Sequence, residues 1–459
     1  MNWRDECIDA SICTAEGSSC ENFLTTLFSA LESSDVRYCV LHSWEELPYK
    51  LSSDLDLAVY PQDVPKLSLV FRALRERGYT PVQVFNYSVS AYYFVFFWLE
   101  GAVVRSVAID VIFEHRRGGL IVPSVETLIS DRRKHGAFWI PGPESEFTYL
   151  LAKKTWKGSA PAKQVTRLRV LVEQLGRHTA ERLSGQLFLG NLKVRVVEAC
   201  AGAQLDVMLA QISTQTWKTS LVRNPLRLTT FVVLEGIRCV RRWMQPTGFF
   251  VVVMGPDGVG KSTLIGQLLQ VVGRGFRRYR VFHWRPMLLW RRRNTGDVTQ
   301  PHSRPPHAGW WSIARLLAHV LDYWFGYWLV IRPLLARSGL AVFDRYFEDV
   351  LIDPKRYRYG GPLWVAQILR MLVPKPDLVL VLDAQEEVVL SRKQEVAPEE
   401  MQRQRRLYSG YKNTTSRARI IDATGSVQQV TAEAARAVID CLAERFEHRH
   451  ASWLSRSPS

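Results

Sequence analysis

Short strand-like runs, most of them rich in apolar residues, alternate with helical patterns in the second half of the chain. The runs lie at residues 249–254, 279–284, 340–346, 377–383 and 419–422. Segments whose apolar residues recur every three or four positions separate them, and a closing helix is expected over 430–446. Uninterrupted apolar runs of this length are typical of parallel strands that are buried on both faces. The pattern therefore predicts a doubly wound parallel sheet with helices on both sides.

The first half of the chain mixes strands and helices in a less regular order. Strands are expected over 36–41, 53–59 and 107–113, and helices over 147–156 and 165–175. The fold class that follows is α/β in both halves. The parts that we expect are an N-terminal α/β domain over 1–180, a helical connector over 181–245, a doubly wound domain over 246–447 and a polar tail over 448–459.

Length and charge restrict the function classes without choosing one. A chain of 459 residues is too long for one ordinary core. Its 60 lysines and arginines outnumber its 44 acids and give a net charge of +16. Such an excess indicates an anionic partner, which is a nucleotide phosphate, a nucleic acid or an anionic membrane surface. A basic surface that only serves solubility is the alternative.

Cysteine usage and the apolar segments predict a reduced, cytoplasmic protein. The 7 cysteines are scattered without a C-x-x-C pair. The first residues are charged, so we expect no signal peptide. The most apolar long segment, 310–336, contains Arg315, His319, Asp322 and Arg332, which favours a buried or amphipathic helix over a transmembrane one. Contact with a membrane surface and a homodimer both stay open.

A glycine-rich loop follows the apolar run at 249–254. The sequence Gly-Pro-Asp-Gly-Val-Gly-Lys-Ser-Thr begins at Gly255 and matches the spacing G-x-x-x-x-G-K-[ST] between a strand and a helix. In such a loop, backbone N–H groups and the lysine bind phosphate oxygens, and the hydroxyl binds Mg²⁺. We therefore expect ATP and Mg²⁺ as cofactors. The residues that bind them are Gly255, Asp257, Gly258, Val259, Gly260, Lys261, Ser262 and Thr263.

Three aspartates lie on strands expected in the first half. Asp54 and Asp56 are two residues apart and face the same way on a strand, and Asp110 lies within a second apolar strand. Carboxylates that converge among buried strands are costly unless a cation neutralises them, and Mg²⁺ prefers such oxygen ligands. The three residues are therefore candidates for a second metal site. Surface acids at strand ends are the alternative.

These aspartates resemble the pattern of the polymerase-β-type nucleotidyltransferase superfamily. That pattern is a Gly-Ser turn, then D-x-[DE] on a strand, then a further acid on a neighbouring strand. The resemblance implies that Ser43 is the turn serine and that Asp54, Asp56 and Asp110 bind metal. His42 departs from it, because a Cβ at the glycine position crowds the approach of a triphosphate. A domain of this fold that has lost activity stays open.

Charged residues also stand where strands of the second half end. Arg285-Pro286 follows the second strand, and Asp344-Arg345-Tyr346 ends the third. In doubly wound sheets, ligands bind at the carboxyl ends of the strands. After the fourth strand, Arg403 and Arg406 are three residues apart on one helix face. Phosphoryl transfer needs such positive groups around the transferred oxygens.

Together these motifs resemble the thymidylate kinase family of P-loop kinases over residues 246–447. The loop is similar to G-x-D-G-x-G-K-[ST], Asp344-Arg345-Tyr346 to D-R-[YFH], and Arg285-Pro286 to an R-E-P turn without its Glu. The resemblance implies a set of catalytic, metal-binding and acceptor-binding residues. They are Lys261, Asp344, Arg345, Arg403 and Arg406 for catalysis, Ser262 and Asp344 for Mg²⁺, and Arg285, Arg345 and Arg392 for the acceptor.

The chain departs from this family directly after Tyr346. A serine and a base-reading run usually follow, but here Phe347 and Glu348 do. The groups that contact thymine are therefore not evident. The acceptor stays open between thymidylate, another nucleotide and a sugar.

Three functions remain after these observations. The first is an ATP-dependent kinase that transfers the γ-phosphate to a nucleotide-like or other anionic small molecule. The second is a Mg²⁺-dependent nucleotidyltransferase in the first half, with the P-loop half supplying or sensing nucleotide. The third is a nucleic-acid-binding ATPase, suggested by the net charge. Nucleic acid is disfavoured as a partner because Ala384 follows Asp383, where motor ATPases usually place a Glu.

Overall fold

The computed structural model describes most of the chain in two compact units. The described residues are 15–16, 18–114, 116–117, 120–121, 123–188, 190–202, 205, 208–209, 212, 225–288, 305–384, 398–411 and 415–454. The N-terminal unit consists of Cys13–Phe96, Val107–Val240 and Phe446–Ser459. The C-terminal unit contains Phe97–Ser106 and Arg241–Arg445. Each unit is described by itself.

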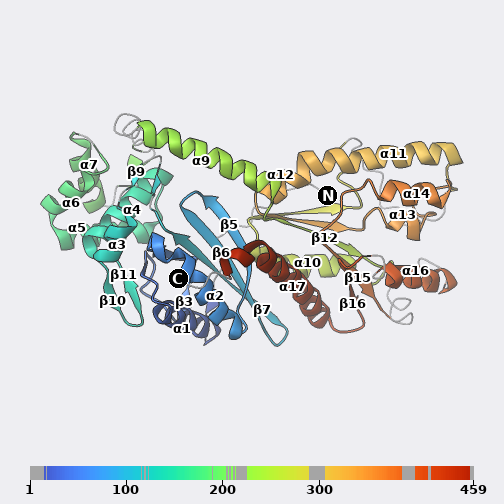
Figure 1. Cartoon of the computed structure of the whole chain (residues 1–459), viewed down its shortest axis with the longest axis horizontal. Helices are drawn as coiled ribbons and strands as arrows, with labels where there is room; N and C mark the ends of the chain where they lie inside the picture. The colour runs from blue at the N-terminus through green and yellow to red at the C-terminus, as the bar shows by residue number, and fades with distance from the viewer. Residues whose placement is uncertain are drawn as a thin grey trace. The chain divides into compact units, whose positions relative to one another are not determined.

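The elements alternate along the chain in the order that Figure 1 labels. Up to residue 244 they are β1 (Ala15–Glu16), α1 (Ser18–Ser33), β2 (Tyr38–Val40), β3 (Lys50–Leu51), β4 (Leu55–Val59), η1 (Pro61–Lys66), α2 (Leu67–Glu76), β5 (Thr80–Ser88), β6 (Ala91–Glu100), β7 (Val103–Ile112), β8 (Arg116–Arg117), β9 (Leu120–Ile121), α3 (Val125–Ser130), β10 (Arg133–His135), β11 (Phe138–Ile140), α4 (Pro143–Lys157), α5 (Ala162–Leu175), α6 (Arg177–Ser184), α7 (Leu192–Ala201) and α9 (Pro225–Met244). From residue 249 they are β12 (Phe249–Met254), α10 (Lys261–Val272), η2 (Gly273–Gly275), β13 (Arg278–His283), α11 (Gly309–Gly326), η3 (Tyr327–Ile331), α12 (Arg332–Ala336), β14 (Gly339–Asp344), α13 (Asp349–Ile352), α14 (Leu363–Arg370), β15 (Leu378–Asp383), α16 (Pro398–Gly410), β16 (Ala418–Asp422) and α17 (Val427–Leu454).

A mixed five-stranded sheet forms the centre of the N-terminal unit. Its strand order is β2-β4-β7-β6-β5, with β2 antiparallel and β7 parallel to β4. The register of β4 and β7 pairs Asp56 with Asp110. Apolar residues of α4, α5, α6 and α7 share one core with residues of β2 and β4. The first part of the segment that we expected to connect the halves therefore contributes to this core.

An all-parallel five-stranded sheet forms the centre of the C-terminal unit. Its order is β13-β14-β12-β15-β16, and all four pairs of neighbouring strands are parallel. All six residues of β12 are buried, as are the first five of β14 and of β15. This burial accounts for their uninterrupted apolar sequences. The sheet confirms the predicted fold class: the chain is an α/β protein, and the sheet of its C-terminal unit is all-parallel.

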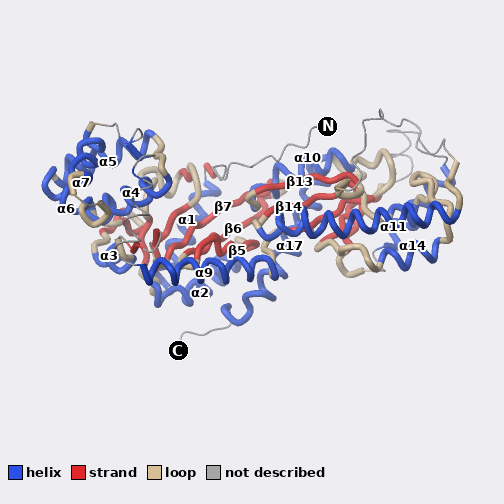
Figure 2. Tube along the Cα trace, turned by 90° about the horizontal axis from the view of Figure 1, so that it is seen from above, coloured by secondary structure: helices blue, strands red, loops and turns tan. Residues whose placement is uncertain are grey.

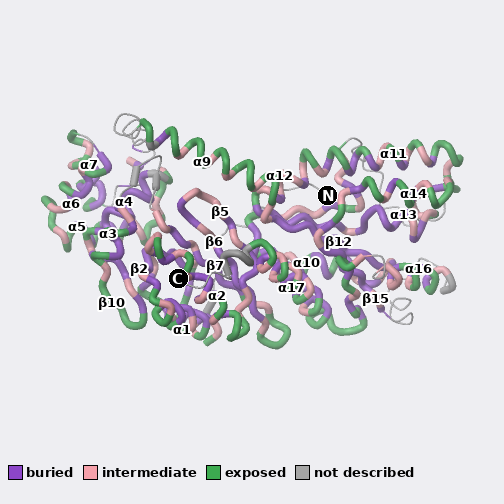
Figure 3. Tube along the Cα trace, viewed as in Figure 1, coloured by how far each residue is buried: buried purple, intermediate pink, exposed green. Residues whose placement is uncertain are grey.

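Helices cover both faces of the parallel sheet. Figure 1 shows α11 and α12 on one side of it and α10 and α17 on the other. α11 and α14 lie side by side in two views (Figures 1 and 2) and are in contact. The strands of the sheet are largely buried, whereas α9 and α11 carry long exposed stretches (Figure 3). Among the helices that the structure describes, none is both long enough and apolar enough to cross a membrane.

Candidate functional site

The phosphate loop joins the end of β12 to the start of α10. Gly255, Gly258 and Gly260 all have positive φ angles, of 145°, 82° and 102°. A Cβ at Gly255 would lie 2.7 Å from the carbonyl oxygen of Leu382, so this position also needs glycine for space. The helix α10 begins at Lys261, directly after Gly260 of the loop. A helix N-terminus with free N–H groups is suited to bind phosphate.

Lys261 is folded back onto this loop. Its ammonium donates to the carbonyl oxygens of Gly255 and Pro256, at 2.9 and 2.6 Å, and lies 3.9 Å from Oδ1 of Asp257. Burial, with the nearby charge of Arg345, lowers the pKa of Lys261 to about 7. An anion beside this ammonium would favour its charged form. Ser262, the next residue, is exposed in the first turn of α10.

Arg345 connects the end of β14 to the loop. Its φ of 70° is left-handed, and its N–H donates to the carbonyl oxygen of Val253 at 2.9 Å. Its guanidinium bonds Asp257 and lies 3.3 Å from Oδ2 of Asp349. Arg356 bonds the other carboxylate oxygen of Asp257. Burial opposes the charge of Asp257, but Arg345, Lys261 and Arg356 together lower its pKa.

Asp344 lies between the phosphate loop and the end of β13. Nδ1 of His283 lies 3.2 Å from its Oδ2, while its buried Oδ1 has no hydrogen-bond partner among the described residues. Burial raises the pKa of Asp344, but the bond from His283 and the charge of Lys261 outweigh it and lower the pKa. A buried carboxylate oxygen without a partner fits a cation such as Mg²⁺. Ser262 and Asp344 are therefore the residues that would hold the ion.

A pocket of about 360 Å³ opens beside the phosphate loop. Residues 258–260 and Leu264 form one wall, and Leu382, Val427 and Val430 contribute to the others. Thr263 also lines it. Its volume lies within the usual range of small-molecule sites, and its walls are mainly apolar. The pocket therefore suits the base or ribose of a nucleotide whose phosphates lie on the loop.

The arginines that were predicted after the fourth strand of the parallel sheet have differing surroundings. Arg403 donates to the carbonyl oxygen of Ile352 at 2.8 Å and pairs with Glu400 at 2.6 Å. Arg406 is exposed, and Arg392 lies outside the described residues. Arg405 was not predicted as a site residue, yet its guanidinium donates to both oxygens of Asp383 at 2.8 and 3.2 Å. In the sequence, only its position between Arg403 and Arg406 could have indicated a role for Arg405.

Arg285 lies in the turn after β13, and a side chain of α11 forms hydrogen bonds with this turn. Nη1 of Arg285 lies 3.1 Å from Oδ2 of Asp322, which is fully buried. The same carboxylate accepts backbone hydrogen bonds from Met287 at 3.0 Å and Leu288 at 2.8 Å. One aspartate of α11 therefore fixes both the predicted acceptor-binding arginine and the backbone that follows it.

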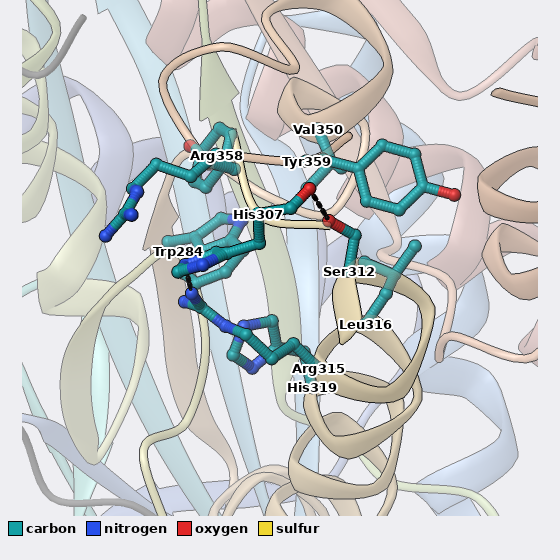
Figure 4. A pocket seen from close by; sticks show the side chains of 10 residues that line it. Trp284, His307, Ser312, Arg315, Leu316, His319, Val350, Arg358 and Tyr359 are labelled. Carbon is teal, nitrogen blue, oxygen red and sulfur yellow. Dashed lines mark hydrogen bonds between the residues drawn. The ribbon is translucent and has the colours of Figure 1, made fainter. Parts of the chain in front are cut away.

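A small polar cavity lies next to this turn (Figure 4). It measures about 10 Å³, which is room for about one water molecule. Trp284, His319 and Tyr357 line it, and each has a buried side-chain polar atom, Nε1, Nδ1 and the hydroxyl, without a hydrogen-bond partner among the described residues. Buried polar atoms without partners are rare in proteins, so these three point to a bound polar group.

The same cavity carries uncompensated positive charge. Arg315 and Arg358 line it, and none of the described residues around it is acidic. Arg315 donates to Nε2 of His307 rather than to a carboxylate. Burial, together with Arg358 and Arg285, lowers the pKa of Arg315. An anionic ligand would relieve this repulsion. Sequence reasoning used Arg315 and His319 only as evidence against a membrane span.

The three aspartates of the N-terminal unit are not arranged as a metal site. Oδ1 of Asp56 accepts from Nζ of Lys153 at 2.9 Å, and Oδ2 lies 2.9 Å from Nε2 of His42. The hydroxyl of Tyr87 lies 2.7 and 2.9 Å from the two oxygens of Asp110. Burial, with the charge of Asp56, raises the pKa of Asp110 to about 7.

These contacts do not fit a divalent cation held between the carboxylates. An ammonium already lies beside Asp56. Among the described residues, no group of three His, Cys, Asp or Glu side chains could hold a metal ion. Asp54 precedes β4 and Ser43 has a left-handed φ of 56° beside His42. Asp56 and Asp110 therefore lie on the expected strands, whereas Asp54 lies just before β4 rather than on it.

Comparisons with known proteins give a partial structural likeness. No family model and no curated protein matches the chain. Thymidylate kinase from Candida albicans is 18% identical with a TM-score of 0.31, and the match covers 45% of this chain and 93% of that one. Thymidylate kinase from Ehrlichia chaffeensis is 15% identical with a TM-score of 0.29, covering 42% and 100%.

Proposed function

We propose that the C-terminal unit is an ATP-dependent phosphotransferase that transfers the γ-phosphoryl group to an anionic small molecule. The observation that carries this proposal is the adjacency of three strand ends. The N–H of Trp284, after β13, donates to the carbonyl of Asp344 at 2.9 Å, and Arg345, after β14, bonds Val253 of β12. The polar cavity, the Asp344-Arg345 pair and the phosphate loop therefore follow neighbouring strands, where ligands bind in doubly wound sheets.

The donor side of the reaction belongs to the phosphate loop. The N–H groups of the loop and Lys261 bind the phosphate oxygens of ATP, and the 360 Å³ pocket receives its nucleoside. Ser262 and Asp344 would hold Mg²⁺, which would supply positive charge to the phosphate oxygens. Lys261 must then leave the carbonyls of Gly255 and Pro256, so its buried positive charge becomes available to phosphate.

The acceptor side belongs to the turn after β13 and the polar cavity. Arg285, beside the cavity, and Arg315, which lines it, attract the anionic group of the acceptor. Trp284, His319 and Tyr357 hydrogen-bond the single polar atom or water that the cavity has room for. Arg345 stays between Asp257 and Asp349 and fixes the loop relative to the end of β14. Arg403 and Arg406 of α16 supply positive charge to the transferred group. The acceptor is a nucleotide, such as thymidylate, or another anionic small molecule, such as a sugar phosphate.

The experiment is a phosphorylation assay with labelled ATP and Mg²⁺ against nucleoside monophosphates, nucleosides and sugar phosphates. We expect one class to be phosphorylated by the wild type, and the Lys261→Ala variant to be slower by a factor of about 100 or more. Lys375→Ala removes an exposed lysine of the same unit and is the matched control. Equal rates for wild type and Lys261→Ala on every acceptor would contradict the proposal.

A second variant separates the acceptor site from the phosphate loop. Arg315→Met removes a cavity charge that touches no residue of the loop in the described contacts. It is expected to raise KM for the acceptor at least tenfold while KM for ATP stays within a factor of two. An unchanged KM for the acceptor would show that the acceptor does not bind at this cavity.

A further inference from the structure

The N-terminal unit contains a buried cluster of charged side chains that the proposed kinase does not use. Lys153 of α4, Asp56 of β4 and His42 have side-chain exposures of 10%, 12% and 9%. Nζ of Lys153 lies 2.9 Å from Oδ1 of Asp56 and 2.8 Å from Nε2 of His42. The two side chains from distant parts of the chain therefore meet one carboxylate.

Both oxygens of Asp56 are engaged by these contacts. His42 reaches Oδ2 at 2.9 Å while Lys153 holds Oδ1. A divalent ion would sit about 2.0–2.6 Å from such oxygens. It would then have to displace the ammonium, and Lys153 would lose its charged partner in a buried place. An unpaired buried charge is far costlier than a paired one.

The neighbouring carboxylate supports the same conclusion. Asp110 pairs with Asp56 in the register of β4 and β7, and its two oxygens accept from the hydroxyl of Tyr87. A metal ion shared by Asp56 and Asp110 would need at least one oxygen of each carboxylate to face it. Here one acid is bound by an ammonium and the other by a phenol. Asp56 and Asp110 therefore both contact donor groups of this chain.

We propose that the ammonium of Lys153 is the resident counter-ion of this cluster, in the place that a metal ion takes in the nucleotidyltransferase pattern. The N-terminal unit then keeps the strands and acids of that pattern without metal-dependent nucleotidyl transfer. The buried pair ties α4 to β4 and specifies how the helices pack on the sheet. This role goes beyond the proposed phosphotransferase, which belongs to the other unit.

The first test is metal binding by the full-length chain without nucleotide. Mn²⁺ is titrated and the free ion is measured by electron paramagnetic resonance, for the wild type and for Asp56→Asn. We expect the same number of bound ions for both proteins, because no ion uses Asp56. A bound Mn²⁺ that is present in the wild type and lost in Asp56→Asn would overturn the proposal.

The second test is a double-mutant cycle on thermal unfolding. Asp56→Asn and Lys153→Met each leave one buried group without its partner, and each is expected to lower Tm by roughly 6–12 °C. The double variant removes both charges and is expected to recover at least half of that loss. Strictly additive losses would overturn the proposal. Arg169→Met with Glu173→Gln, an exposed pair at 3.1 Å, is the control and is expected to change Tm by less than about 2 °C.

A third measurement needs only the wild type, in case a variant does not fold. Fe²⁺ with ascorbate cleaves a polypeptide next to bound iron. We expect no cleavage near residues 42, 56 or 110, and cleavage at these positions would overturn the proposal. None of the three measurements uses phosphoryl transfer, so their outcome is independent of the proposed kinase activity.

Discussion

At the scale of single residues, the C-terminal site depends on arginines that are held by buried carboxylates. Arg345 contacts Asp257 and the fully buried Asp349, and Asp349 also accepts from Tyr408 at 2.7 Å. Replacing Arg345 by Met leaves both acids without their strongest partner. We expect a loss of about 3–5 kcal/mol in the free energy of unfolding, measured by urea denaturation. Arg337→Met, at an exposed position, should change it by less than about 0.5 kcal/mol. Equal effects of the two variants would contradict the assignment.

His319 gives a prediction on pH at the same scale. Burial, with the charges of Arg285 and Arg315, lowers its pKa to about 3. The unfolded chain binds a proton at a pKa near 6.5, so the folded protein loses stability as pH falls below that value. Between pH 7 and pH 5, we expect His319 to account for a loss of about 2 kcal/mol. Urea denaturation at both pH values should show a smaller loss for His319→Gln. The same loss in both proteins would show that this histidine is not neutral in the fold.

At the scale of elements, α11 positions the turn after β13. Asp322 is its contact with that turn, through Arg285 and the N–H groups of residues 287 and 288. Asp322→Ala should free the turn without changing the phosphate loop. We expect KM for the acceptor to rise at least tenfold and KM for ATP to stay within a factor of two, measured by steady-state kinetics. A rise in both constants would indicate general damage to the fold rather than loss of this contact.

The elements were predicted more fully than the sites that they carry. Buried parallel strands have continuous apolar sequences, so β12, β14 and β15 were evident, and the loop motif located Lys261. The polar cavity was not predicted, because Arg315 and Arg358 lie far apart in sequence and meet only through tertiary packing. The partner of Asp56 was missed for the same reason, since Lys153 is distant in the chain. The spacing of residues along the sequence identifies local motifs. The role of a charged residue depends on the partners that tertiary packing brings next to it, and these are not evident from the sequence.

At the scale of the whole molecule, the outer face of α11 offers an apolar surface for the homodimer that the sequence left open. Exposed apolar side chains recur along α11 and η3 at Trp310, Leu317, Leu321, Trp324 and Trp328. The spacing of the last four, 4-3-4, is that of a helix that packs along another helix. The adjacent α14 and the turn directly after it expose five more, at Leu363, Trp364, Ile368, Met371 and Leu372. Together the ten side chains leave on the order of 1,000 Å² of apolar surface, comparable to what one partner buries in a stable complex.

This surface leads to a prediction on the mass of the particle in solution. We expect light scattering after gel filtration to give twice the mass of one chain for the wild type, and one chain for Leu321→Glu. Val170→Glu, at an exposed position of α5, is the matched control and should keep the wild-type mass. A monomeric wild type that pellets with anionic lipid vesicles would assign the face to a membrane surface instead.

The two faces of α11 have a consequence for how the protein behaves on dilution. The inner face holds Asp322 and the cavity residues Arg315 and His319, and the outer face carries the exposed tryptophans. When two chains separate, the outer face of α11 becomes exposed to water, and we expect the side chains on its inner face to be held less firmly. The turnover number per chain of the proposed phosphotransferase should therefore fall on dilution. A rate measured at low protein concentration would then be lower than the rate at high concentration.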